Sequence, residues 1–222
     1  MTQDTHVEKQ VGRPRGEYEL RRIQIAEATW SVISERGFAN ASMRAIAREA
    51  GFTTGVLTHY FENKDEILEF ALIHAFRGVE ELLDQAMSED NVIVVLRKMT
   101  LDNMPINSSN RRKWSAWQGY LTKSESNLQI AETIKRIHAT NYSKLTKLLQ
   151  RGQKDGTVRD DFSATDLAMQ WNTMINGLIR MAPFEPDGLS IEQLTQVIDV
   201  HLAMIASAPP CDRQSTRKNR AH

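Results

Sequence analysis

The stretch that decides the fold is SMRAIAREAGFTTGVLTHYF, residues 42–61. Ser42 can cap a short helix whose apolar residues recur at the three- and four-residue spacing of one helix face, and Gly51 ends that helix. Thr53 and Thr54 then offer caps for a second short helix. Two short helices joined by a tight turn that contains glycine are typical of a helix-turn-helix, whose second helix enters the major groove of DNA. We therefore predict a DNA-binding motif over these residues.

The residue types of the second short helix suit contact with DNA. Thr53 and Thr54 bring hydroxyl groups to a helix N-terminus, where free backbone N–H groups favour a phosphate. Gly55 lets the backbone approach closely, and Thr58 offers a hydroxyl and a methyl group to base edges. Further side chains that can donate to phosphate oxygens are His59, Tyr60 and Lys64.

Helical periodicity continues on both sides of the motif. A helix is expected from residue 17 to Gly37, and Asn63 can cap a longer helix after the motif. Because no segment shows sustained strand-like alternation, we predict an all-α fold, with further helices near 89–104, 109–123, 127–153, 163–182 and 190–206. The expected parts are a mobile basic arm, a DNA-binding domain, a body for ligand binding and dimerisation, and a disordered basic tail, at 1–16, 17–79, 80–208 and 209–222.

Composition is that of an ordinary globular chain and carries no bulk electrostatic signal. The 222 residues include 28 Lys and Arg against 28 Asp and Glu, so any basic surface must be local. A single cysteine, Cys211, cannot form an internal disulfide and suits a reducing compartment. No export signal and no apolar run of membrane-spanning length is present, so we expect a cytoplasmic protein without a membrane partner.

Residues 43–61, followed by Lys64-Asp-Glu-Ile-Leu, resemble the TetR family of bacterial regulators, and the likeness extends over about residues 20–79. The resemblance implies a nine-helix, all-α protein with a three-helix DNA-binding head and a larger body for ligand binding and dimerisation. Thr58 departs from the bulky aromatic residue often found there in the family, which bears on base preference. The DNA contacts that the resemblance implies are Arg44, Thr53, Thr54, Gly55, Thr58, His59, Tyr60 and Lys64.

Before the first expected helix lies a basic tract, Gly12-Arg-Pro-Arg. Such a short, extended arm can place Arg13 and Arg15 in a narrow minor groove, where the negative potential is enhanced. The alternative is a solvated tail that adds only non-specific affinity for DNA.

Aromatic side chains gather on the expected helices of the body. Helical bundles form ligand pockets between their helices, and an aromatic cluster can cage a quaternary ammonium by cation–π attraction. Residues 114–120 and 174–180 are similar to BetI-type regulators, a branch that includes choline-responsive repressors, so a choline-like or apolar effector is implied. The alternative is that these side chains are ordinary core. The pocket candidates are Trp114, Trp117, Tyr120, His138, Tyr142 and Trp171.

The last two expected helices each carry an apolar stripe. The two stripes can pack against their own copies across a two-fold axis, as the family resemblance also implies, or they can close the core of the single chain. A dimer also suits DNA reading, because two recognition helices read a near-palindromic site. The predicted interface residues are Leu167, Met174, Leu178, Leu194, Ile198 and Leu202.

These observations predict a homodimeric, sequence-specific transcription regulator, usually a repressor in this family, that leaves operator DNA when a small molecule binds the body. One alternative is a DNA-bound adaptor whose body binds a protein. The other is a helical enzyme, which the sequence disfavours because it has no phosphate loop, zinc-type spacing or nucleophile elbow. We accordingly expect no catalytic residue, cofactor or metal site.

Overall fold

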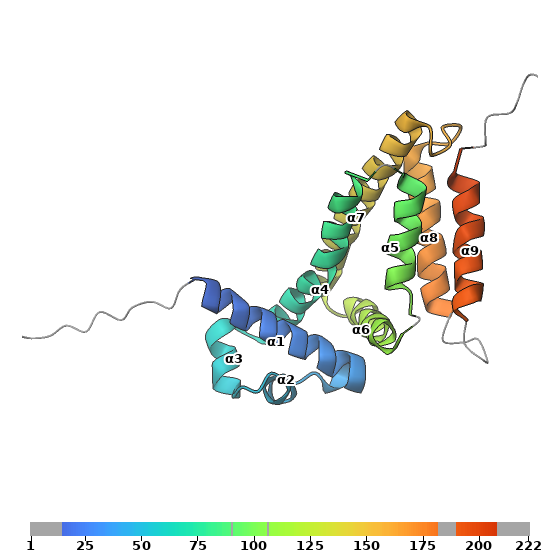
Figure 1. Ribbon diagram of the computed structural model, residues 1–222. Helices are drawn as coiled ribbons and strands as arrows, with labels where there is room; N and C mark the ends of the chain where they lie inside the picture. Colours follow the sequence, from blue (N-terminus) through green and yellow to red (C-terminus); the bar gives the residue numbers. More distant parts are fainter. Residues whose placement is uncertain (1–14, 90, 106, 182–189, 208–222) are drawn as a thin grey trace, which may run out of the picture. The chain divides into compact units, whose positions relative to one another are not determined.

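The computed structural model describes residues 15–89, 91–105, 107–181 and 190–207. Over these residues the regular structure is helical, with nine α-helices and one short 3₁₀ helix, which confirms the predicted all-α class (Figure 1). The elements are α1 (Arg15–Arg36), η1 (Phe38–Asn40), α2 (Met43–Glu49), α3 (Thr54–Tyr60), α4 (Lys64–Ala86), α5 (Val92–Asn103), α6 (Ser108–Ser124), α7 (Leu128–Asp155), α8 (Ala164–Met181) and α9 (Ile191–Ile205).

Polar caps fix where the short helices begin, as the sequence predicted. The Ser42 side chain accepts a hydrogen bond from Ala45 N, and the Thr53 hydroxyl accepts one from Val56 N at 3.3 Å. Asn63 Oδ1 accepts from the backbone N–H of residue 66 at 2.9 Å, which caps the start of α4. Each contact satisfies an N–H group that has no partner within its helix.

The chain divides into two compact units, Met1–Ala75 and Phe76–His222, which we call the N-terminal and the C-terminal unit. The N-terminal unit packs α1 against α2 and α3, and α2 against α3. Its core is apolar and includes Ile25, Ile46, Leu57, Phe61 and Ile67, none of them more than 2% exposed. This core holds α3 by one face and leaves its other face to solvent.

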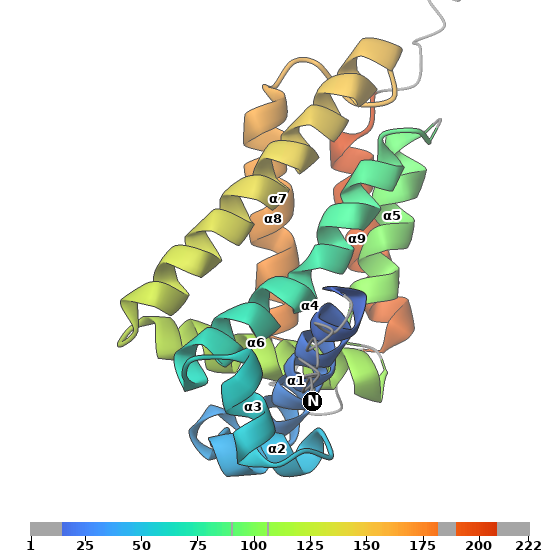
Figure 2. The same ribbon diagram turned by 90° about the vertical axis from the view of Figure 1, so that its left-hand side faces the viewer.

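In the C-terminal unit, α7 packs against α6 and α8, and α5 packs against α7 and α9 (Figure 2). Arg97 on α5 forms a two-pronged ion pair with Asp199 on α9, at 2.6 and 3.0 Å. Lys144 on α7 contacts both Glu80 and Asp84 near the end of α4, at 3.0 and 2.6 Å. These ion pairs join α5 to α9 and α7 to α4 at the surface of the unit.

After α7, the chain turns through Gly156, which has a φ of 79°, and runs back alongside the C-terminal end of α9. An isolated antiparallel bridge joins Val158 to Ala206 there. Gly152, within α7, lies so close that a Cβ atom on it would stand 2.5 Å from Val158 Cγ2. The close approach explains why position 152 has no side chain.

Candidate functional site

The turn between α2 and α3 depends on Gly51. Its φ of +72° lies in the left-handed region that other residues rarely adopt, while no heavy atom would crowd a Cβ there. Phe52 N donates to Ala47 O at 2.8 Å across the turn. Backbone geometry, and not lack of space, therefore requires glycine at this point of the motif.

Most of the predicted DNA contacts lie on the exposed surface of the N-terminal unit. Thr58 Oγ1 donates to Gly55 O at 3.1 Å, so its hydroxyl is anchored within α3 while its methyl group stays accessible. Lys64, at the start of α4, is half-buried. The exposed members of the set are Arg44, Thr53, Thr54, Gly55, Thr58 and His59.

Tyr60 requires a correction to the predicted contact set. The residue is only 4% exposed and belongs to the apolar core, because it closes the last turn of α3 against α1. Its ring lies 4.9 Å from that of Tyr18, whose hydroxyl donates to Tyr60 O at 3.4 Å. A buried ring supports α3 from beneath and offers DNA little surface.

Arg22 supports the segment between α3 and α4, and sequence reasoning missed it. Its guanidinium pairs with Glu66 at 3.1 Å and lies 4.5 and 4.4 Å from the ring centres of Phe61 and Phe70. The second carboxylate oxygen of Glu66 accepts from Glu62 N at 2.7 Å. One arginine thus joins α1 to the turn that positions α3. Its distance of 44 residues from Glu66 left no local signal in the sequence.

Of the predicted minor-groove arm, Arg13 lies outside the described residues. Arg15 is the first residue of α1, and its side chain is not described.

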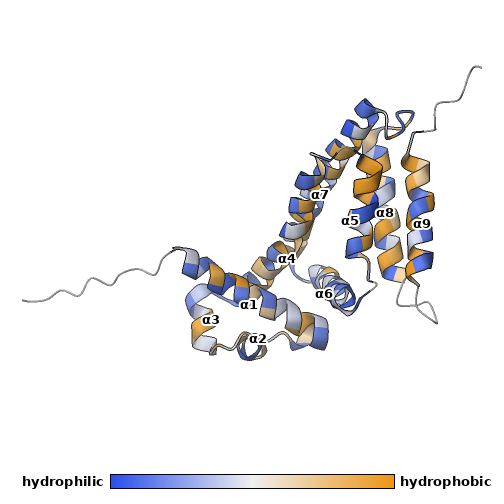
Figure 3. Ribbon diagram, in the orientation of Figure 1, coloured by the Kyte–Doolittle hydropathy of each residue, from blue (hydrophilic) through white to orange (hydrophobic). Residues whose placement is uncertain are grey.

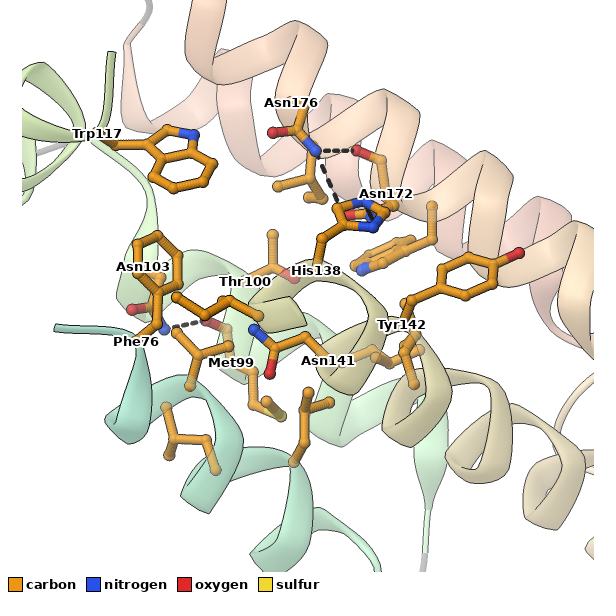
Figure 4. Close-up of a pocket in the computed structure, with 18 of the residues that line it drawn as sticks. Phe76, Met99, Thr100, Asn103, Trp117, His138, Asn141, Tyr142, Asn172 and Asn176 are labelled. Carbon is orange, nitrogen blue, oxygen red and sulfur yellow. Dashed lines mark hydrogen bonds between the residues drawn. The ribbon is translucent and has the colours of Figure 1, made fainter. Parts of the chain in front are cut away.

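The C-terminal unit contains a cavity of about 200 Å³, lined by residues of α4, α5, α6, α7 and α8. This volume exceeds the roughly 150 Å³ of an engineered cavity that admits benzene, so the cavity has room for a ligand larger than one ring. Figure 4 shows its lining, with Phe76, Trp117, His138 and Tyr142 around the space. The predicted pocket residues among the lining are Trp114, Trp117, His138, Tyr142 and Trp171.

Tyr120 is the exception and corrects the predicted pocket. It does not line the cavity, and its side chain is fully buried in the body of the unit. Burial raises the pKa of its hydroxyl far above the usual value, because a charged phenolate would lose its water. The helical pattern placed Tyr120 on the correct helix but did not reveal which neighbours it faces.

The polar atoms of the aromatic lining are largely engaged by the protein itself. Trp114 Nε1 donates to Asn103 O, and the Tyr142 hydroxyl donates to Thr165 O, both at 2.7 Å. His138 Nε2 lies 3.0 Å from the amide nitrogen of Asn172. These bonds orient the rings and leave mostly apolar surface facing the cavity, as ligand pockets commonly show.

Sequence reasoning missed several polar residues of the lining, among them Lys113. It also missed the amides of Asn103 and Asn141, which Figure 4 shows. Lys113 Nζ lies 3.5 Å from Asn103 Oδ1, a long hydrogen bond, and burial lowers the pKa of this ammonium group. Asn141 has no hydrogen-bond partner among the described residues, so its carboxamide is available. Aspartate and glutamate are absent from the described lining.

The predicted dimer residues lie largely within the single chain, which corrects that prediction. Leu167, Leu194, Ile198 and Leu202 are each 3% exposed or less, while Met174 and Leu178 pack partly buried against the core. These stripes face inward because α8 and α9 use them to contact α7 and α5. Both helices are rich in hydrophobic residues (Figure 3), and their exposed apolar side chains include Met169, Val197, Val200 and Met204.

Two features of the described residues bear on other function classes. Groups of three or more side chains suited to hold a metal ion are absent there. In the same part of the chain, every helix is too short or too polar to cross a bilayer.

Comparison with known proteins gives consistent results over both units. Residues 25–71 match the family described as bacterial regulatory proteins, tetR family, and residues 94–207 match the BetI-type transcriptional repressor C-terminal family. The regulator PksA of Bacillus subtilis is 28% identical over 194 residues, which cover 85% of this chain and 91% of that protein. The regulator BetI of Vibrio campbellii is 24% identical over 205 residues, covering 86% and 93%.

Solved structures show the same architecture. A transcriptional regulator from Saccharomonospora viridis, crystallised in complex with choline, superposes with a TM-score of 0.72 at 25% identity, covering 86% of this chain and all of that one. A regulator from Rhodococcus superposes with a TM-score of 0.73 at 22% identity, covering 85% and 99%. These relatives are all described as transcriptional regulators, which disfavours the enzymatic alternative.

Proposed function

Since the chain belongs to the TetR family of bacterial DNA-binding transcription regulators, with a C-terminal region of the BetI type, we propose that it is a homodimeric repressor. It binds a near-palindromic operator through α3 and leaves it when a small-molecule effector occupies the cavity of the C-terminal unit. The observation that carries this proposal is the exposed, capped recognition helix α3 in a chain that also contains an apolar cavity. Its DNA partner places it in the cytoplasm.

The exposed residues of the N-terminal unit divide into two kinds of DNA contact. Thr53, Thr54 and Lys64 bring hydroxyl, backbone N–H and ammonium donors to helix N-termini, where they position the protein on phosphates. Arg44, Gly55 and Thr58 are the candidates for reading bases, since they combine a long donor, a close backbone approach and a methyl group. His59 adds a further donor to phosphate.

Helix α4 carries residues proposed for DNA binding and residues proposed for effector binding. Its first residue is Lys64, a proposed DNA contact, and its later residues Phe76, Val79, Leu82 and Leu83 line the cavity. A ligand that favours one position of these later residues shifts the equilibrium between DNA-binding and released states by its differential affinity for the two. The cavity also favours a small-molecule effector over a protein partner, because an adaptor needs no cavity of this size.

The experiment is a selection of operator sequences from random DNA by the full chain, followed by titration of the best site by fluorescence anisotropy. Arg44→Ala should weaken operator binding at least tenfold, whereas Arg112→Ala, which removes an exposed arginine of α6, should leave it unchanged. An enriched two-fold-related motif is the expected outcome of the selection. Failure to enrich any sequence, or equal effects of the two variants, would contradict the proposal.

A further inference from the structure

The cavity of the C-terminal unit has a marked charge asymmetry. Lys113 is among the lining residues, and its ammonium group lies beside Asn103, another of them, whereas no Asp or Glu of the described residues lines the cavity. Nor does any described carboxylate pair with Lys113, whose one hydrogen bond, to Asn103 Oδ1, is 3.5 Å long. The charge of Lys113 is therefore poorly compensated within the described part of the protein.

An uncompensated ammonium beside an apolar cavity is costly, because burial removes water that would stabilise its charge. The pKa of Lys113 is lowered for this reason. A ligand that brings a negative charge would restore the missing partner, and charge-assisted hydrogen bonds are the stronger ones in proteins. A ligand that brings a positive charge would add repulsion to the same site.

The other lining residues define the rest of the ligand. Asn141 supplies an amide without a partner among the described residues, which can donate to an oxygen of the ligand. The cavity has an apolar wall of aromatic rings, supplied by Trp114, Trp117 and Trp171. The indole N–H of Trp114 already donates to Asn103 O, so it needs no partner from the ligand. Such a wall suits an alkyl or aryl body of the ligand.

We propose that the effector is an amphipathic monocarboxylate, whose carboxylate pairs with Lys113 and whose apolar body lies among the tryptophan side chains. This inference rests on the proposed function and names the chemical class of its effector. It differs from the choline-like effector that the BetI-type resemblance implied, since choline is a cation. The aromatic wall could attract a quaternary ammonium by cation–π contact, so the two classes must be compared directly.

Three probes with the same eight-carbon chain separate the classes: octanoate, 1-octanol and octyltrimethylammonium, with choline as a fourth. Binding to the full chain is followed by tryptophan fluorescence and by calorimetry. Octanoate should bind at least tenfold more tightly than octyltrimethylammonium or choline, with octanol between them. Tighter binding of either cation, or no binding of octanoate at millimolar concentration, would overturn the proposal.

Lys113→Met keeps an unbranched side chain, one atom shorter, and removes its charge. This variant should bind octanoate at least tenfold more weakly, a loss of about 1.4 kcal/mol of binding free energy. It should still bind octanol, which would show that the cavity is intact. Lys113→Arg should retain the preference for octanoate. Lys147→Met, at an exposed lysine of α7 outside the cavity, should behave like the wild type. Unchanged octanoate affinity in Lys113→Met would refute the assignment.

Operator binding of the same preparations keeps the two proposals distinct. If the wild type does not bind octanoate but binds its selected operator, the regulator proposal stands and the proposed effector class is wrong. If octanoate binds and operator DNA does not, the cavity assignment stands and the DNA proposal is wrong.

Discussion

The hydroxyl group of Thr58 donates a hydrogen bond to the carbonyl oxygen of Gly55, 3.1 Å away on the exposed side of α3. The hydroxyl proton is therefore already used, and the side chain offers a DNA partner an oxygen acceptor and a methyl group. A methyl group of this kind can contact the methyl of thymine, while the oxygen can accept from an adenine or cytosine amino group. Thr58 is thus a candidate for discriminating among bases without supplying a charge.

Replacing Thr58 by Val and by Ala separates these two contributions. Thr58→Val keeps a methyl group and loses the hydroxyl, while Thr58→Ala loses both, and neither should affect folding much because the position is exposed. We expect Thr58→Ala to lose about 1–3 kcal/mol of discrimination at one base pair, with binding to random DNA and its salt dependence unchanged. Equal losses on operator and random DNA would argue against base reading.

Two glycines of the motif should respond oppositely to alanine. Gly51→Ala forces a left-handed backbone on a residue with a Cβ and should destabilise the protein by about 1–2 kcal/mol. Gly55 lies within α3 with only the Thr53 hydroxyl near a Cβ, at 3.8 Å, so Gly55→Ala should stabilise it by roughly 0.5–1 kcal/mol. Gly55→Ala should nevertheless weaken operator binding, because the new methyl group would stand where we propose that the backbone approaches DNA. Thermal unfolding and anisotropy, measured on both variants, check the pair of predictions.

The helical fold could be predicted because its signals are local. Ser42, Thr53 and Asn63 cap helices through contacts within three residues, and Gly51 marks its turn by conformation alone. Which helix faces contact one another was harder to predict than the helices themselves, for a physical reason. An apolar residue on a helix shows that one face is buried, but the pattern does not say which neighbour covers it.

The candidate site illustrates the same limit. Tyr60 and Tyr120 were expected at functional surfaces and are core residues, since an aromatic ring with a polar tip fits either place. Lys113 went unnoticed for the converse reason, because a lysine on a polar helix is ordinarily solvated. Its proximity to Asn103 arises only when the chain turns between the end of α5 and the start of α6.

The proposed dimer uses the exposed apolar side chains of the last two helices. Val197, Val200 and Met204 follow the three- and four-residue spacing of one helix face on α9. Val200→Glu should therefore place a carboxylate in the interface, yield monomers in light scattering and weaken operator binding. Leu128→Glu, at a more exposed apolar residue of α7, is the matched control and should remain dimeric. A dimeric Val200→Glu protein would place the interface elsewhere.

The ion pair between Arg97 and Asp199 should make stability depend on pH. The hydrogen bond from Arg97 lowers the pKa of Asp199 below its usual value near 3.8, so the pair stabilises the folded state above that pH and is lost as the pH falls through the lowered pKa. The Tm of the wild type should exceed that of Asp199→Asn at pH 7, and the difference should vanish in acid. Because both side chains are 44% exposed, the effect should be small and weaken with salt. Asp160→Asn controls for loss of one surface carboxylate.

Gly152 and Val158 form a steric pair that a double-mutant cycle can test. A Cβ on residue 152 would stand 2.5 Å from Val158 Cγ2, and Val92 Cγ2 lies 3.1 Å away, so Gly152→Ala should destabilise the protein by about 1–3 kcal/mol. Val158→Ala removes the closer methyl group, and Gly152→Ala should cost less in that background. Strictly additive losses in thermal or denaturant unfolding would show that the helix moves instead of the valine. Ala164→Gly, at a buried alanine that begins α8, gives a control for changing one methyl group at a helical position in the same unit.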